Sequence, residues 1–250
     1  MQPRILFQTL AIGEHRLDAQ TSHHLAVVLR AQAGQLVTLF DGQGVTLFDG
    51  QGQEGQGKIT AVQRSEVTVC VTAVEHVLRE SPLAITVVQS LCTGDKMDWV
   101  IQKATELGAA VIVPLAAARS VLKLEGVRAA KRVAHWAAIA QAASAQSGRT
   151  LVPRIRPIQT LHEVLDEWRH SPSPKTGVHL DPFAAQGLSE AQISGPITLM
   201  IGPEAGWSDD EEVLMQRAGF RSVRCGPRIL RTETAALVAL TALAIRAGEF

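Results

Sequence analysis

Beyond Ser81-Pro82 the chain alternates short apolar runs with longer amphipathic segments, and this alternation constrains the fold more than any other feature. The run LAITVVQSL is nearly continuous in apolar residues, as expected of a strand buried on both faces of a sheet. The next segment, GDKMDWVIQKATELG, places Met97, Val100, Ile101, Ala104 and Leu107 at helical spacing, with Gly108 as a stop signal. A repeated strand–helix pattern predicts an α/β fold with a mostly parallel sheet and helices on both faces.

The same pattern continues to the C-terminus. Further strands are expected at residues 109–116, 151–158, 177–181, 197–202 and 220–226, with helices at 126–148, 160–169 and 208–217 and from Thr232 onward.

Residues up to about Glu75 are instead rich in short β-type runs, at 35–44, 57–64 and 66–75, separated by Asp-Gly and Gly-Gln turn signals. One helix is expected, in SHHLAVVLRA, with Ser22 as its N-cap. Several short strands with one helix predict a small β-barrel. We therefore expect a barrel domain at residues 1–76 and an α/β domain at 77–250, with the boundary falling near Val77 to Pro82.

The octet VTLFDGQG occurs at Val37–Gly44 and again at Val45–Gly52. Two copies are too few to build a solenoid, which needs several stacked repeats. The sequence indicates a tandem duplication that lengthens a hairpin or its loop, with one copy a strand and the other a Gly-rich excursion. Which copy is which is left open by the sequence.

Charge and cysteine content exclude several function classes. The 24 basic residues balance 24 acidic ones, so the protein has no overall positive charge that would indicate a nucleic-acid partner. The three cysteines are far apart, which fits reduced thiols and predicts no metal site. The first residues, MQPRILFQ, contain no signal-peptide core, and no apolar stretch is long enough to span a membrane, so a cytoplasmic protein is expected.

Two loops that follow expected strands combine features of a ligand site. In the first, the strand ending at Ile201 runs into Gly202-Pro203-Glu204-Ala205-Gly206, and Ser208 with Glu211 forms a capping-box pattern. Glycines allow close approach of a ligand to the main chain, and ligands of open α/β sheets bind at the carboxyl ends of strands. An ordinary Gly/Pro turn before a capped helix is the alternative.

The second loop, from Cys225, brings Arg231-Thr232-Glu233-Thr234 to the start of the last helix. For Thr232 and Glu233, capping of this helix is the simple alternative. Arg231 is harder to explain in this way, because a cation at a helix N-terminus opposes the helix dipole. A solvated or ion-paired arginine is its alternative role. Neither loop is a GxGxxG or Walker sequence, so neither a dinucleotide nor a triphosphate is favoured.

Together, IGPEAGWSDDE and GPRILRTETA resemble the C-terminal signatures of the trefoil-knotted, S-adenosylmethionine-dependent RNA methyltransferases, and more narrowly the RsmE-type family that methylates N3 of a uridine in 16S ribosomal RNA. Other segments resemble that family in the expected order: HHLAVVLRAQAG, KMDWVIQKATELGAAVIVPL, ARSV, AQSGRTLVPRI and HLDP. The resemblance spans nearly the whole chain. The chain departs from the pattern at Ala205, where glycine is usual, and at Ala118 and Ala145, which stand where acidic residues are usual.

The resemblance implies a C-terminal trefoil knot, a PUA-like N-terminal barrel, a homodimer and a bent S-adenosylmethionine held by the two loops. It implies a cofactor site at Leu199, Ile201, Gly202, Pro203, Glu204, Gly206, Cys225, Gly226, Ile229, Leu230, Arg231 and Thr234. Arg231 is the first candidate for stabilising negative charge on the uracil. Glu233 and Glu204 are candidates for accepting the N3 proton or for orienting Arg231.

A local basic stripe is the candidate for phosphate contacts. Eight basic residues and one acid lie between Arg119 and Arg156. The candidates for RNA binding are Arg119, Arg128, Arg132 and Arg149, with Arg4, His24 and Arg30 in the barrel. A solvated basic helix face, and for His24 a structural role, are the alternatives. A knotted enzyme for another RNA, such as tRNA, and a non-catalytic RNA-binding relative are the competing functions.

Overall fold

The computed structural model describes residues 2–8, 10–44, 51–63 and 66–250, and these residues form two compact units. One unit comprises residues 1–80 together with 144–152, and the other comprises residues 81–143 and 153–250. We expected residues 144–152 in the second half of the chain. They group with the first unit because both oxygens of the Glu80 carboxylate accept hydrogen bonds from this segment, including the main-chain N–H groups of Thr150 and Leu151, each at 2.9 Å.

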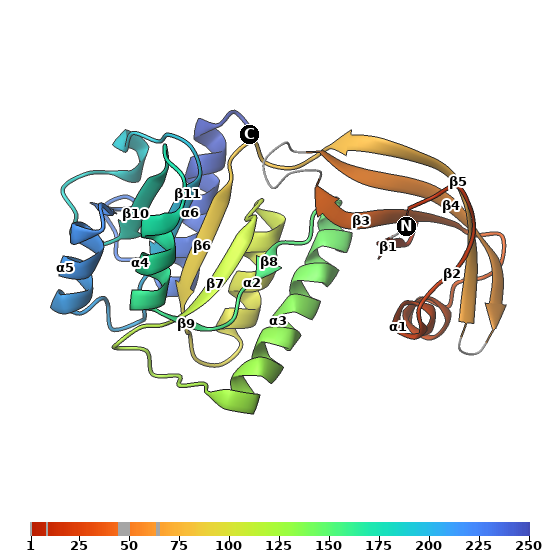
Figure 1. Ribbon diagram of the computed structural model, residues 1–250, viewed down its shortest axis with the longest axis horizontal. Helices are drawn as coiled ribbons and strands as arrows, with labels where there is room; N and C mark the ends of the chain where they lie inside the picture. Colours follow the sequence, from red (N-terminus) through yellow and green to blue (C-terminus); the bar gives the residue numbers. More distant parts are fainter. Residues whose placement is uncertain (1, 9, 45–50, 64–65) are drawn as a thin grey trace. The chain divides into compact units, whose positions relative to one another are not determined.

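The first unit is built on a five-stranded sheet with the order β1-β3-β4-β5-β2. Its elements are β1 (Arg4–Leu6), β2 (Gly13–Arg16), α1 (Ala19–His23), a π-helical turn η1 (His24–Val28), β3 (Leu36–Gly44), β4 (Gln51–Gln63) and β5 (Glu66–Leu78). The long strands β3, β4 and β5 run antiparallel, whereas β1 pairs parallel with β3 (Figure 1). Alternate residues of these strands, among them Val37, Leu39 and Val69, are fully buried in one apolar cluster.

Three details of this unit differ from the expectations. The helix begins earlier than expected, with Asp18 as its N-cap, whereas Ser22 is buried within it and links Leu17 to Val67 by hydrogen bonds. Strands β1 and β2 were not expected, since three- and four-residue strands give too short a pattern to recognise. The first copy of the octet lies in β3, whereas residues 45–50 of the second copy lie outside the described residues.

The second unit contains a seven-stranded sheet in which every pairing is parallel. Its strands are β6 (Ile85–Ser90), β7 (Val111–Ala116), β8 (Arg154–Ile155), β9 (Gln159–Thr160), β10 (Thr176–Leu180), β11 (Ile197–Ile201) and β12 (Arg221–Val223). Its helices are α2 (Lys96–Glu106), α3 (Gly126–Ser147, whose last turn belongs to the first unit), α4 (Leu161–His170), the 3-10 turn η2 (Leu188–Glu190), α5 (Asp209–Arg217) and α6 (Thr232–Arg246). The expected alternation is confirmed, although the run 151–158 forms the two-residue strand β8 and not one long strand.

Helices cover both faces of this sheet (Figure 1). On one face, α4 and α5 pack against strand residues in a cluster that includes Val88, Met200 and Trp207. On the other face, α2 and α6 lie next to each other. The strand order is β12-β10-β11-β6-β7-β8. The chain therefore first adds β7 and β8 on one side of β6 and then reverses direction, so that β10, β11 and β12 lie on the other side of β6. In open α/β sheets such a reversal is where ligands bind.

Local sequence explains where the helices around this reversal begin. Ser208 accepts a hydrogen bond from the main-chain N–H of Glu211, whose carboxylate accepts one in return, so the expected capping box of α5 is confirmed. Thr160 and Glu163 form the same motif at α4. Within the described part of the chain, no helix combines the length and apolar character needed to cross a membrane.

Candidate functional site

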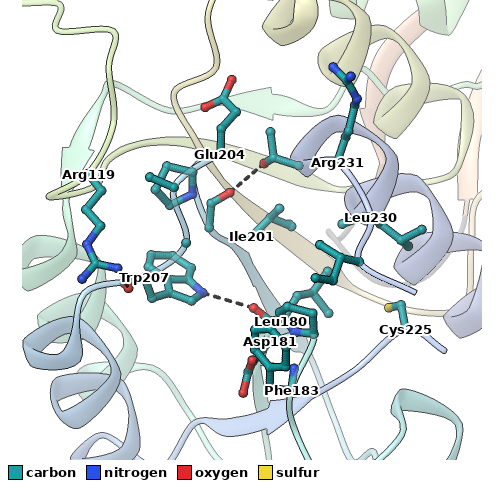
Figure 2. Close-up of a pocket in the computed structure, with 18 of the residues that line it drawn as sticks. Arg119, Leu180, Asp181, Phe183, Ile201, Glu204, Trp207, Cys225, Leu230 and Arg231 are labelled. Atoms are coloured by element: carbon teal, nitrogen blue, oxygen red, sulfur yellow. Dashed lines mark hydrogen bonds between the residues drawn. The ribbon is translucent and has the colours of Figure 1, made fainter. Parts of the chain in front are cut away.

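A cavity of about 650 Å³ opens at the carboxyl ends of β10 and β11, and the loop that follows β12 closes it (Figure 2). The two loops singled out from the sequence therefore meet. Of the residues expected to hold a cofactor, the following line the cavity: Ile201, Gly202, Pro203, Glu204, Gly206, Cys225, Ile229, Leu230 and Arg231.

Three expected cofactor residues do not line this cavity. Leu199 lies in the middle of β11, fully buried between Val178 and Val87 of the neighbouring strands. Gly226 has a φ of 79° and shapes the turn after β12, while Thr234 lies in the first turn of α6. Their positions predict effects on the shape of the loops and not direct contact with a ligand in this cavity.

The loop after β11 is a tight turn shaped by two glycines. A Cβ atom on Gly202 would lie 3.1 Å from the Trp207 ring, so glycine lets the indole pack directly against the main chain. Gly206 has a φ of 73°, which favours glycine, and its N–H donates to the main-chain oxygen of Pro203 at 2.9 Å. Ala205 does not adopt positive φ, because Arg30 is the one non-glycine residue with positive φ within the described ranges. Alanine at position 205, where glycine is usual in the family, is therefore not strained by a positive φ.

Trp207 was not identified from the sequence, yet it forms a wall of the cavity. Its side chain is only 6% exposed, and its indole N–H donates to the main-chain oxygen of Leu180 at 3.2 Å. The guanidinium of Arg119 donates to the main-chain oxygen of Trp207 at 2.6 Å. Arg119, which we expected to bind RNA, is thus engaged in holding a cavity loop.

The end of β10 supplies a second group of residues that sequence reasoning did not assign to the site. Leu180, Asp181, Pro182 and Phe183 all line the cavity, and they include the end of the HLDP segment (Figure 2). The Asp181 carboxylate accepts hydrogen bonds from the main-chain N–H of Phe183 at 2.8 Å and from the Ser222 hydroxyl at 2.9 Å. An Asp-Pro pair after a strand was the available signal, but it is also typical of an ordinary turn.

Thr232 joins the two loops at the back of the cavity. Its hydroxyl donates to the main-chain oxygen of Gly202 at 2.6 Å and accepts from the Gln89 side-chain amide at 3.0 Å. Because a hydroxyl has one proton, these two bonds define its orientation. The start of α6 is thereby tied to the ends of both β6 and β11.

A polar rim lies at one end of the cavity. Glu204 and Arg231 both point toward this end, away from Leu180 and Asp181 (Figure 2). The ammonium of Lys96 lies 3.4 Å from a Glu204 oxygen and 3.5 Å from an oxygen of Glu233, which does not itself line the cavity. The lysine was not identified from the sequence, where it stands at the start of an expected helix with no sign of its two partners.

Burial changes the ionisation of several groups around the cavity. It raises the pKa of the Cys225 thiol to about 11, so the thiol stays protonated at neutral pH. Burial, together with the charges of Asp181 and Asp209, raises the pKa of Glu212 above its usual value, and Arg119 opposes this effect. The Leu180–Trp207 side of the cavity thus carries acidic groups that a bound cation would stabilise.

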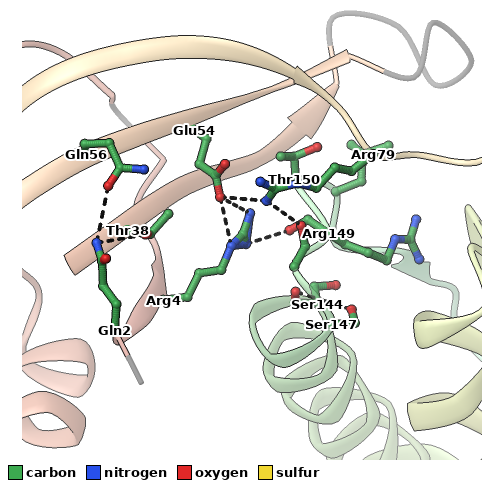
Figure 3. A network of polar contacts seen from close by, with 12 residues as sticks. Gln2, Arg4, Thr38, Glu54, Gln56, Arg79, Ser144, Ser147, Arg149 and Thr150 are labelled. Atoms are coloured by element: carbon green, nitrogen blue, oxygen red, sulfur yellow. Dashed lines mark hydrogen bonds and ion pairs between the residues drawn. The ribbon is translucent and has the colours of Figure 1, made fainter. Parts of the chain in front are cut away.

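Arg4 and Arg149 were expected to bind RNA, and the structure contradicts both assignments (Figure 3). The Arg4 side chain is 11% exposed, and its guanidinium pairs with the buried Glu54 at 2.9 Å and contacts the ring of Phe40. The Arg149 side chain is 6% exposed and pairs with Glu80 at 2.6 Å. The Arg4 guanidinium is held by Glu54 and by the main-chain oxygen of Arg149, and the Arg149 guanidinium is held by Glu80, so neither is available to a phosphate.

The remaining basic candidates differ in accessibility. Arg128 is exposed on α3, whereas Arg132 lies 3.8 Å from Asp98, which also accepts a hydrogen bond from the Trp136 indole at 3.0 Å. His24 and Arg30 are exposed at η1 and just beyond it, so His24 is not a buried structural histidine.

Comparison with known proteins agrees with this geometry. The model of an RNA methyltransferase domain family matches residues 79–244. The ribosomal RNA small subunit methyltransferase E of Bacillus subtilis is 33% identical over 240 residues, covering 91% of this chain and 88% of the relative. Its namesake in Mycobacterium bovis is 30% identical over 237 residues, covering 92% of this chain and 85% of that protein.

A solved structure extends the likeness to three dimensions. The crystal structure of a ribosomal RNA small subunit methyltransferase E from Neisseria gonorrhoeae, bound to S-adenosyl methionine, matches with a TM-score of 0.88 and 36% identity, covering 98% of each chain. The chain belongs to the RNA methyltransferase family that includes the ribosomal RNA small subunit methyltransferases E.

Proposed function

We propose that the protein methylates ribosomal RNA of the small subunit with S-adenosylmethionine as the methyl donor, and that the product is 3-methyluridine in 16S ribosomal RNA. One observation carries the proposal. The loops after β10, β11 and β12 enclose one cavity in a chain that matches the S-adenosylmethionine-bound Neisseria enzyme over 98% of its length.

The cavity fits such a donor in size and chemistry. Its volume of about 650 Å³ lies in the range of small-molecule sites. Apolar side chains of Leu180, Ile201 and Leu230 offer surfaces for an adenine ring, and main-chain groups near Gly202 offer hydrogen bonds to its edge. Glu204 and Asp181 favour a cation. When bound, S-adenosylmethionine supplies an electrophilic methyl group on a positively charged sulfur.

The chain's own residues then position the target base and manage its proton. Uridine N3 must lose a proton before it can act as a nucleophile. Arg231, at the rim, would stabilise the negative charge that develops on the uracil oxygens. Glu204 or Glu233 would accept the proton or orient Arg231.

The finer features of the family are part of the same proposal. We place the methyltransferase domain at residues 77–250, with a trefoil knot that brings its loops together, and a PUA-like RNA-binding domain at residues 1–76. Exposed Arg30, His24 and Arg128 are the RNA contacts we retain. We also propose a homodimer that acts on the small ribosomal subunit in the cytoplasm.

The test uses small ribosomal subunits from a strain that lacks its own enzyme for this modification. After incubation with the purified protein and S-adenosylmethionine, the RNA is digested and analysed for 3-methyluridine by mass spectrometry. We expect the nucleoside to appear with the wild-type protein and to be lost with Arg231→Ala. Arg217→Ala is the matched control, because Arg217 lies in the last turn of α5 and does not line the cavity.

Three outcomes separate the parts of the proposal. Methylation by the wild type and Arg217→Ala but not by Arg231→Ala supports both the reaction and the site. Calorimetric binding of S-adenosylmethionine without methylation contradicts the substrate, and transfer RNA becomes the next RNA to assay. Absence of cofactor binding contradicts the proposed role of the cavity.

A further inference from the structure

Lys96 connects three segments that are distant in the sequence. It is the first residue of α2, and its ammonium lies 3.4 Å from Oε1 of Glu204, in the loop after β11. The same ammonium lies 3.5 Å from Oε2 of Glu233, in the first turn of α6. One cation therefore stands between the two carboxylates that are candidates for the proton acceptor.

Helix stability does not explain a lysine at this position. A cation in the first turn of a helix opposes the helix dipole and weakens α2 slightly. Ion pairs that solvent reaches contribute little to stability, and the Lys96 and Glu204 side chains are each 30% exposed. The position of the Lys96 ammonium between the two glutamates explains this lysine better than a contribution to the stability of the fold does.

Glu233 depends on Lys96 more strongly than Glu204 does. Its side chain is 15% exposed, and its Oε2 atom is buried without a hydrogen-bond partner in the described part of the chain. Burying a polar oxygen without a hydrogen-bond donor costs free energy unless a charge of opposite sign lies beside it. The Lys96 ammonium lies beside this oxygen.

The ionisation of the cluster agrees with this geometry. Burial raises the pKa of Glu204, but hydrogen bonds from main-chain N–H groups and from Lys96 outweigh it, so this pKa lies below its usual value. Burial lowers the pKa of Lys96, but its hydrogen bond to Glu204 and the charge of Glu233 raise it above the usual value. The titratable groups facing Lys96 are Glu204 and Glu233. The charges of all three residues also act on the buried Cys92 thiol, whose pKa burial raises to about 12.

We propose that Lys96 is a positioning residue for methyl transfer, which holds the carboxylates of Glu204, at the rim of the cavity, and of the neighbouring Glu233 in place. This inference rests on the proposed function, since it assigns these carboxylates to a site for a cationic donor and an acidic N–H. Lys96 acts through the glutamates and need not touch the base. Without its ammonium, the two neighbouring carboxylates would repel each other, and Glu204 would lose one of the hydrogen bonds that lower its pKa.

The test compares Lys96→Met, which removes the charge and keeps the length, with Lys96→Arg, which keeps the charge. Lys103→Met is the matched control, because Lys103 lies on the same helix and pairs with Glu106 at 2.8 Å without lining the cavity. The affinity for S-adenosylmethionine is measured by calorimetry from acidic to alkaline pH. Single-turnover methylation of small subunits is measured over the same range, and thermal unfolding confirms that each variant is folded.

For Lys96→Met we expect the acid limb of both pH profiles to move upward by about one pH unit, which corresponds to roughly a tenfold loss of function on that limb. At alkaline pH, where Glu204 is ionised in either protein, affinity should equal that of the wild type or exceed it. Lys96→Arg and Lys103→Met should reproduce the wild-type profiles. In the binding profile, adding Glu233→Gln to Lys96→Met should return the acid limb toward its original position, because the charge of Glu233 then no longer opposes ionisation of Glu204.

Coincident acid limbs for Lys96→Met and the wild type would overturn the inference. A shift of the same size in Lys103→Met would also overturn it, because the effect would then reflect loss of any positive charge on α2. Failure of the wild type to bind S-adenosylmethionine or to methylate RNA is a different result. It contradicts the proposed function and is seen before any variant is compared.

Discussion

The indole N–H of Trp207 donates a hydrogen bond to the main-chain oxygen of Leu180 at 3.2 Å. This bond links the loop after β11 to the last residue of β10, so two parallel strands that lie side by side are also joined where they end. The ring also packs against Gly202. One side chain thus sets the distance between two walls of the cavity.

Replacing this side chain tests how far the cavity depends on the link. Trp207→Phe keeps an aromatic ring but removes the N–H, leaving the Leu180 oxygen without its partner. We expect the free energy of unfolding to fall by about 1–3 kcal/mol. We also expect the affinity for S-adenosylmethionine to fall by about tenfold, equivalent to about 1.4 kcal/mol, because the walls are no longer held together. Urea denaturation and calorimetry measure the two quantities.

Trp168→Phe is the matched control. Its indole N–H donates to the main-chain oxygen of Ala218 at 3.0 Å, and the residue does not line the cavity. Trp168→Phe also removes one indole-to-main-chain hydrogen bond, so the free energy of unfolding should fall by a similar amount while cofactor affinity stays at the wild-type value. Equal losses of affinity in the two variants would show that general destabilisation, and not the Trp207–Leu180 link, is responsible.

The sequence predicts the second unit well because its information is local. Apolar runs, helical spacing and capping motifs such as Ser208 with Glu211 lie within a few residues of each other, and the structure has the corresponding elements. Strands β1 and β8 have three and two residues and rely on pairing with distant strands, so no local pattern predicts them.

The same difference between local signals and contacts with distant residues decides which parts of the candidate site could be predicted. Both Gly-containing loops were found because glycine and proline are local signals, and the structure brings the loops to one cavity. Lys96 and Trp207 were missed because their roles depend on partners more than 20 residues away. Arg4 and Arg149 were wrongly assigned to RNA for the same reason: a pattern of charge does not reveal Glu54 or Glu80 beside them.

Gly206 provides a test of backbone conformation at the cavity. Its φ is 73°, and a Cβ atom there would have no neighbour within 4 Å. An alanine at this position is therefore disfavoured by the positive φ and not by a steric clash. We expect Gly206→Ala to lower the free energy of unfolding by about 1–2 kcal/mol. The turn it belongs to should also relax, so the affinity for S-adenosylmethionine should fall several-fold in a calorimetric titration.

Gly219→Ala separates these two effects. Gly219 has a φ of 88° and open space around it, but it follows α5 and does not line the cavity. Its substitution should lower stability by a similar amount without changing cofactor affinity. If Gly206→Ala bound S-adenosylmethionine as tightly as Gly219→Ala, the conformation of Gly206 would be irrelevant to the ligand.

Thr232 tests the connection at the back of the cavity. Thr232→Val removes the hydroxyl that donates to Gly202 and accepts from Gln89, so the Gly202 oxygen loses this donor and the buried Gln89 amide loses one of its acceptors. We expect about 2 kcal/mol lower stability and a clear loss of cofactor affinity, with both restored in Thr232→Ser. Thr176→Val is the control, because the buried Thr176 hydroxyl makes two hydrogen bonds with the main chain of Ser194, away from the cavity. A Thr232→Ser variant as weak as Thr232→Val would show that the methyl group, and not the hydroxyl, matters.

His179 makes the stability of the protein depend on pH. It is buried in β10, and its Nδ1 atom has no hydrogen-bond partner among the described residues. Burial lowers the pKa of this histidine below its usual 6.5, although the charge of Asp181 opposes the shift. The unfolded chain therefore binds a proton more readily than the folded protein does, so this contribution to stability is complete above pH 6.5 and is lost as the pH falls toward the folded-state pKa.

Replacing His179 with leucine should therefore reduce the loss of stability on acidification. We expect the difference in the free energy of unfolding between about pH 7.5 and 5.5, measured by urea denaturation, to be smaller in His179→Leu than in the wild type. His162→Gln is the control, because His162 is exposed on α4 and its replacement should leave the difference unchanged. An identical pH dependence in His179→Leu and the wild type would mean that other groups cause the acid destabilisation, since the leucine cannot take up a proton in either state.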